Sequence, residues 1–133
     1  MTQTQKKWLG AAFLMYIVGV QFDLLLIGHY ESFWQYLPVL TLPLVLVTGL
    51  LKYTTDRQSI KMAMRVLSVA LCLMGLLGIY FHTQSNFEFE LELRPSIGGW
   101  ELWKESLTGA LPVLAPASLI PLGLLNFVIS ELE

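Results

Sequence analysis

Four long apolar runs, and the uneven distribution of basic residues around them, constrain this chain more than any other feature. The runs cover about residues 8–28, 33–51, 62–81 and 107–129. Six of the eight Lys and Arg residues precede the first run or lie between or beside the second and third: Lys6, Lys7, Lys52, Arg57, Lys61 and Arg65. Because basic residues accumulate in the cytoplasmic loops of membrane proteins, this distribution predicts four spanning helices with N-in and C-in orientation.

The composition agrees with a membrane protein. The 133 residues are 55% hydrophobic and 14% charged, whereas a typical soluble domain has about 25% charged residues. A spanning helix needs roughly 20 apolar residues, so four such helices occupy most of the chain. We therefore expect one integral membrane domain over residues 1–133, an all-α four-helix transmembrane bundle in the bacterial inner (plasma) membrane. It would contact membrane lipids and would have no nucleic-acid partner.

The tryptophans support the same frame. All four lie near the ends of predicted spans and none lies in the middle of one: Trp8, Trp34, Trp100 and Trp103. Tryptophan rings concentrate at the two membrane–water interfaces because they are amphipathic.

The connection between the third and fourth runs, residues 82–106, is the only long one, and we expect this acidic loop on the outer side. Its residues 87–94 alternate strictly between apolar and charged side chains. A period of two is typical of a strand with one apolar face, and a single strand needs a partner for its backbone groups. After Pro95 and the pair Gly98-Gly99, the spacing of Trp100, Trp103 and Leu107 predicts a short interfacial helix. The predicted partner-binding residues of this loop are Phe87, Phe89, Leu91, Leu93, Trp100 and Trp103.

Two histidines are the main candidates for metal binding. His29 ends the first run and His82 ends the third, so both are expected at the outer boundary at similar depth. Imidazole with carboxylate suits zinc or Cu(II), and a pair of imidazoles suits haem iron. The candidate ligands are His29, Glu31, His82 and Glu88. The alternative interpretation is that both histidines are interfacial and hydrogen-bonded to lipid phosphate, backbone or carboxylate.

Three polar residues within the predicted spans or at their ends need an explanation: Asp23, Asn126 and Ser130. Asp23 is surrounded by apolar neighbours in the first run, where a carboxylate costs roughly 2.5–3.5 kcal/mol on insertion scales. It could serve a proton relay or an ion site, or it could hold helices together by hydrogen bonding. Asn126 and Ser130, one turn apart in the fourth run, are expected to form hydrogen bonds between helices.

Two patterns concern helix packing. Residues Ser68, Cys72, Gly75, Ile79 and His82 share one face of the third run, which predicts a packing seam or, alternatively, a contact with another subunit. The fourth run contains three prolines, and we expect irregular backbone over residues 110–118 with regular helix only from about Pro116.

No nucleophile–base set, phosphate-binding glycine loop or metalloprotease motif is present in the sequence. The leading interpretation is therefore a non-catalytic accessory or structural subunit of a membrane complex, or a homo-oligomer, without a cofactor. A second hypothesis is a metal- or haem-binding redox accessory protein that uses His29 and His82. A third is an oligomeric ion or small-molecule permease that uses Asp23 and the proline-broken fourth span.

Overall fold

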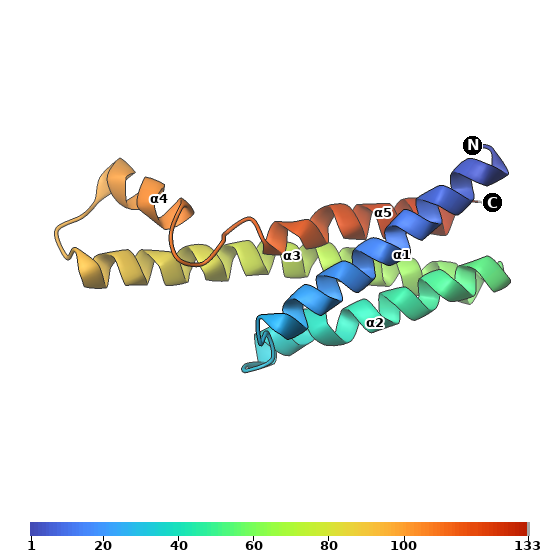
Figure 1. Ribbon diagram of the computed structural model, residues 1–133, viewed down its shortest axis with the longest axis horizontal. Coiled ribbons are helices and arrows are strands. Elements are labelled where there is room, and N and C mark those ends of the chain that lie inside the picture. Colours follow the sequence, from blue (N-terminus) through green and yellow to red (C-terminus); the bar gives the residue numbers. More distant parts are fainter. Residues whose placement is uncertain (133) are drawn as a thin grey trace.

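The computed structural model describes residues 1–132, which are all-helical and contain no strand. Its elements follow in the order α1 (Gln3–Leu26), α2 (Phe33–Thr54), α3 (Gln58–Leu93), α4 (Gly99–Leu107), the short 3-10 helix η1 (Pro116–Ser118) and α5 (Leu119–Glu131) (Figure 1). The predicted all-α class is confirmed.

The helices form an elongated bundle built around α3, which runs along almost the whole molecule (Figure 1). Helices α2 and α5 pack against the first part of α3, and α1 packs on α2 and α5. The start of α1 and the end of α5 lie at the same end of the bundle. The turn between α1 and α2 lies only part-way along α3, so the C-terminal part of α3 projects beyond the bundle with α4 beside it.

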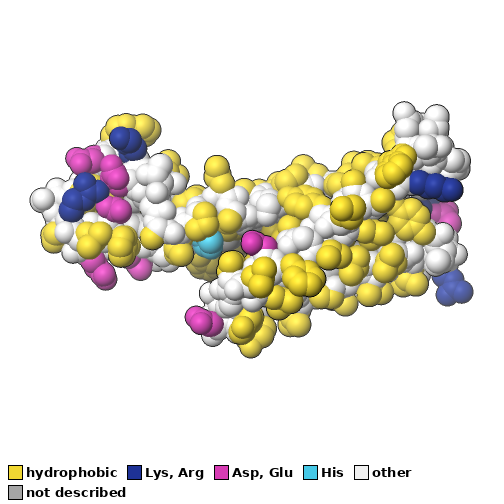
Figure 2. Space-filling view, in the orientation of Figure 1, with side chains coloured by type: hydrophobic (Ala, Val, Ile, Leu, Met, Phe, Trp, Pro, Cys, Tyr) yellow, Lys and Arg dark blue, Asp and Glu magenta, His cyan; other side chains and the backbone are white. Residues whose placement is uncertain are grey.

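Three helices, α1, α2 and α3, are long and apolar enough to cross a membrane. They correspond to the first three predicted spans, except that α1 ends at Leu26 instead of Gly28, so the predicted membrane localisation is supported. Hydrophobic side chains cover most of the visible bundle, and charged side chains gather mainly toward the two ends of the long axis (Figure 2). Most large apolar residues of these helices are exposed, as expected of side chains that face hydrocarbon.

The fourth predicted span is not one full-length helix. Helix α4 already ends at Leu107, and residues 108–115 contain no regular helix. Helix α5 has 13 residues and is therefore about 20 Å long, whereas the hydrocarbon core is about 30 Å thick. Proline lacks the backbone donor that a helix interior requires, and regular structure resumes at Pro116, as the proline positions predicted.

The predicted strand at residues 87–94 is wrong, because α3 continues as helix to Leu93. On a helix, the alternating residues separate into pairs four positions apart: Phe87 with Leu91, and Phe89 with Leu93 on another side. Glu90 and Arg94 form an ion pair at the same spacing. A helix also satisfies its own backbone groups, whereas a lone strand would not. With 36 residues, α3 is about 54 Å long.

The core lies where α1, α2, α3 and α5 meet. Its buried apolar residues are Phe13, Ile17, Leu42, Val45, Met64, Leu71, Leu119, Leu122 and Ile129. Glycines let α3 and α5 approach closely: a Cβ atom on Gly123 would lie 2.7 Å from the Ser68 carbonyl oxygen, and one on Gly75 would lie 2.7 Å from Ile120. The small-residue face of α3 is thus a packing seam against η1 and α5.

Candidate functional site

The projecting hairpin, defined as residues 82–107 of α3 and α4, is the most distinctive surface of the molecule. Arg94 follows the end of α3 and joins the two helices. Its Nη2 lies 2.7 Å from Glu90 Oε2, and its Nη1 lies 3.4 Å from Glu101 Oε1 on α4. Glu105 Oε2 is 3.9 Å from Nη2. The hydrogen bond to Glu90 and the nearby carboxylates raise the pKa of Arg94, so its charge persists over the accessible pH range.

An aromatic contact closes the same hairpin. The rings of Phe87 and Trp103 meet edge to face, with centroids 4.6 Å apart. Of the six predicted partner-binding residues, these two therefore contact each other across α3 and α4. Trp103 remains half-exposed, and the other four residues, Phe89, Leu91, Leu93 and Trp100, are also exposed.

Asn86 holds the segment that leaves α4. Its Nδ2 donates to the carbonyl oxygens of Ser106 and Leu111, each at 2.8 Å. Its Oδ1 accepts from the Leu111 backbone N–H at 2.9 Å. Gly109 lies directly against this amide, because a Cβ there would come within 2.8 Å of Asn86 Cγ. Sequence reasoning missed Asn86, whose partners are backbone groups 20 and 25 residues away.

The two histidines are close enough for His82 to act electrostatically on His29. Gly28 has a left-handed backbone with φ 69°, and the His29 N–H donates to the Leu24 carbonyl at 2.8 Å, so α1 ends in a fixed turn. Burial, and secondly the proximity of His82, lowers the pKa of His29. His82 Nδ1 lies 3.1 Å from the carbonyl oxygen of Pro112. A proton on Nδ1 would donate to that oxygen and leave Nε2 as a free acceptor.

The predicted carboxylate ligands have other surroundings. Glu88 accepts a hydrogen bond from Gln84 Nε2 at 3.1 Å, and Glu31 is exposed on the turn between α1 and α2. Among residues 1–132, no group of three or more His, Cys, Asp or Glu side chains is placed to share a metal ion. The histidine pair therefore supplies at most two protein ligands.

The three polar residues predicted to lie within the spans or at their ends differ in their environments. Asn126 is fully buried, and its Nδ2 donates to the Met64 carbonyl at 2.8 Å and to Ser68 Oγ at 2.9 Å, both on α3. Ser130, in contrast, donates to Phe127 within its own helix. The Asp23 side chain is exposed on α1, beside a groove, and forms no ion pair or hydrogen bond with the described part of the chain.

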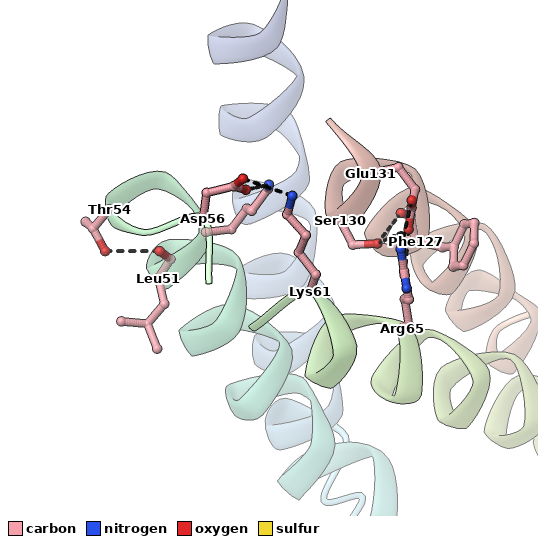
Figure 3. Close-up of polar contacts among 9 residues, drawn as sticks. Leu51, Thr54, Asp56, Lys61, Arg65, Phe127, Ser130 and Glu131 are labelled. Atoms are coloured by element: carbon pink, nitrogen blue, oxygen red, sulfur yellow. Dashed lines mark hydrogen bonds and ion pairs between the residues drawn. The ribbon is translucent and has the colours of Figure 1, made fainter. Parts of the chain in front are cut away.

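The opposite end of the bundle contains most of the basic residues, and two groups of ion pairs link its helices there (Figure 3). Arg65 on α3 binds Glu131 on α5 with two bonds, of 2.7 and 3.0 Å. Asp56 bridges Lys52 Nζ at 2.6 Å and Lys61 Nζ at 2.9 Å. The hydrogen bonds from Lys52 and Lys61 lower the pKa of Asp56. These pairs connect α2, α3 and α5 where the chain turns.

Comparisons with models of protein families, with curated proteins and with solved structures find no match to this chain.

Proposed function

We propose that this protein is a non-catalytic integral membrane subunit. Its bundle anchors it in the bilayer, and its projecting hairpin binds a partner protein whose surface is basic and partly apolar. The observation that carries the proposal is the hairpin itself, which extends beyond the bundle and is fixed internally by Arg94, by Asn86 and by the contact of Phe87 with Trp103.

The length of α3 supports a location of the hairpin outside the hydrocarbon. About 20 residues of helix cross a core of about 30 Å. If the crossing part begins near Met62, the helix emerges near Phe81, and the residues from His82 to Leu93 extend about 18 Å further. The six basic residues at the opposite end favour the cytoplasm for that end. The proposed orientation is therefore N-in and C-in, with the hairpin on the outer side.

The chemistry of the hairpin supports the proposed type of partner. It contains five glutamates against Arg94 and Lys104, a formal charge of −3. Arg94 forms ion pairs with Glu90, Glu101 and Glu105. Glu88 and Glu92, in contrast, are exposed. Phe89 and Leu93 form an exposed apolar stripe beside these carboxylates. Apolar contacts inside a polar rim are typical of protein interfaces, and the negative rim favours a basic surface.

A double substitution tests this proposal. In Phe89→Ser with Leu93→Ser, the apolar stripe is removed, and recovery of the partner in a gentle purification should fall at least about tenfold. The thermal stability of the bundle should stay unchanged, because both side chains are exposed. Leu91→Ser is the matched control: Leu91 is similarly exposed but lies on another side of the helix. Undiminished recovery with the double variant would contradict the proposal.

A second candidate function, a metal- or haem-binding accessory protein, is favoured by one observation. The Pro112 carbonyl orients His82, and His29 lies near it with a lowered pKa. Neutral imidazoles are good metal ligands, and haem needs only two axial ligands from the protein. A Soret band in the purified protein that disappears in His82→Ala would support this function. Absence of both the band and any bound metal would reject it.

A further inference from the structure

A groove along α1 ends at a carboxylate that has no partner. Seven residues line it: Ala12, Met15, Tyr16, Gly19, Val20, Asp23 and, from η1, Ser118. The groove has a volume of about 640 Å³, which is within the usual range for sites that bind small molecules. The residues of α1 recur at spacings of three and four positions, so they follow one face of that helix.

From the groove we infer a binding site for an aminophospholipid of the phosphatidylethanolamine class, with an acyl chain along α1 and the ammonium group on Asp23. The groove is apolar along its length, and Gly19 leaves it open, because a Cβ at this position would have no atom within 4 Å. Its extent from Ala12 to Asp23 is about 16 Å at the rise of a helix. That length is about half the thickness of the hydrocarbon core, which is the reach of one acyl chain.

The charge of Asp23 selects the headgroup. Asp23 lies three residues before the end of α1 and five residues before the predicted outer end of the span, so it is within about 8 Å of the region where lipid headgroups begin. A carboxylate at the edge of the hydrocarbon is stabilised by a cation, and no basic side chain of residues 1–132 forms an ion pair with it. An ammonium headgroup supplies that cation, whereas an anionic phosphatidylglycerol headgroup would be repelled.

The inner wall of the groove is fixed by the protein. The Tyr16 hydroxyl donates to the Ser118 carbonyl oxygen at 3.0 Å, which ties α1 to η1 where α5 begins. The hydroxyl oxygen can still accept a further hydrogen bond. The groove is therefore bounded by a fixed contact between α1 and the C-terminal part of the chain.

Native mass spectrometry of the whole protein, reconstituted in bilayers of equal phosphatidylethanolamine and phosphatidylglycerol, tests the inference. The wild-type protein should retain phosphatidylethanolamine about fivefold more often than phosphatidylglycerol, the factor expected of one exposed ion pair. Asp23→Asn should lose this preference but still retain lipid. Gly19→Leu fills the groove and should lose bound lipid. Glu31→Gln and Val18→Leu, which change an exposed carboxylate and an exposed apolar residue outside the groove, are the matched controls.

Three results would overturn the inference. Equal retention of the two lipids by the wild-type protein would remove the role of the charge. An unchanged preference in Asp23→Asn would place the ammonium group elsewhere. A dimer that Gly19→Leu converts to a monomer would show that a second copy, rather than a lipid, occupies the groove. None of these results depends on the hairpin, so the proposed docking function is tested separately.

Discussion

Replacing Asn86 by alanine should release the segment that follows α4 without unfolding the bundle. The Asn86 side chain is almost completely buried, with 1% exposed, and it forms three hydrogen bonds with Ser106 and Leu111. Alanine removes all three bonds and leaves two carbonyl oxygens and one N–H without their partner.

The expected cost follows from those groups. Each intramolecular hydrogen bond contributes about 1 kcal/mol net, and a buried group left without a partner costs about 1–3 kcal/mol. Leu111 is exposed, so water can reach its freed groups, whereas Ser106 is fully buried. We therefore expect Asn86→Ala to lower the free energy of unfolding by about 3 kcal/mol.

Hydrogen exchange and thermal unfolding in detergent measure this effect. The Leu111 amide should exchange at least about tenfold faster in Asn86→Ala, the factor for about 1.4 kcal/mol. Asn86→Asp keeps the acceptor but places a carboxylate oxygen against two carbonyl oxygens, so it should be no more stable than the alanine variant. Ser85→Ala, at an exposed neighbouring position, is the control. A loss below about 1 kcal/mol with unchanged Leu111 exchange would refute the role of Asn86.

Three further predictions follow from other contacts. Gly123→Val should destabilise the protein by about 1–3 kcal/mol, because its Cβ would lie 2.7 Å from the Ser68 carbonyl oxygen; an unchanged melting temperature would contradict the α3–α5 seam. Arg94→Ala should increase hydrogen exchange in α4 while changing the free energy of unfolding by no more than about 1 kcal/mol. Exchange in α4 at the wild-type rate would show that the ion pairs do not hold the hairpin together. In an NMR titration, His82→Gln should raise the pKa of His29, since His82 contributes to its lowering. Because the pKa of His29 is lower in the folded than in the unfolded protein, the protein loses stability as the pH falls from about 6.5 through the folded-state pKa. His29→Asn should remove this loss.

The first three spans were predictable because each is a long apolar run bounded by charges or tryptophans, and such a run has only one stable form in a bilayer. The proline positions also indicated where the last helix becomes regular. Asn126 was predicted to join helices, and its bonds to Met64 and Ser68 do so.

The hairpin could not be predicted in the same way. A run of alternating residues from Phe87 to Arg94 is compatible with a strand or with two stripes on a helix. Whether this segment forms a strand or a helix depends on its contacts with α4, where Trp103 packs against Phe87 and Glu101 forms an ion pair with Arg94. The role of Asn86 was not predictable either, because an asparagine whose side chain binds backbone groups distant in the chain leaves no recognisable pattern in the sequence.

Photocrosslinking from Phe89 in intact cells tests the central proposal most directly. A photoreactive residue at position 89 should give one discrete crosslinked protein that is absent when the residue is placed at Leu40, an exposed apolar position on α2. A crosslinked band of twice the mass of the chain would identify the partner as a second copy. The proposal that the hairpin docks a partner would be contradicted if position 89 gave no protein crosslink, or gave the same products as position 40.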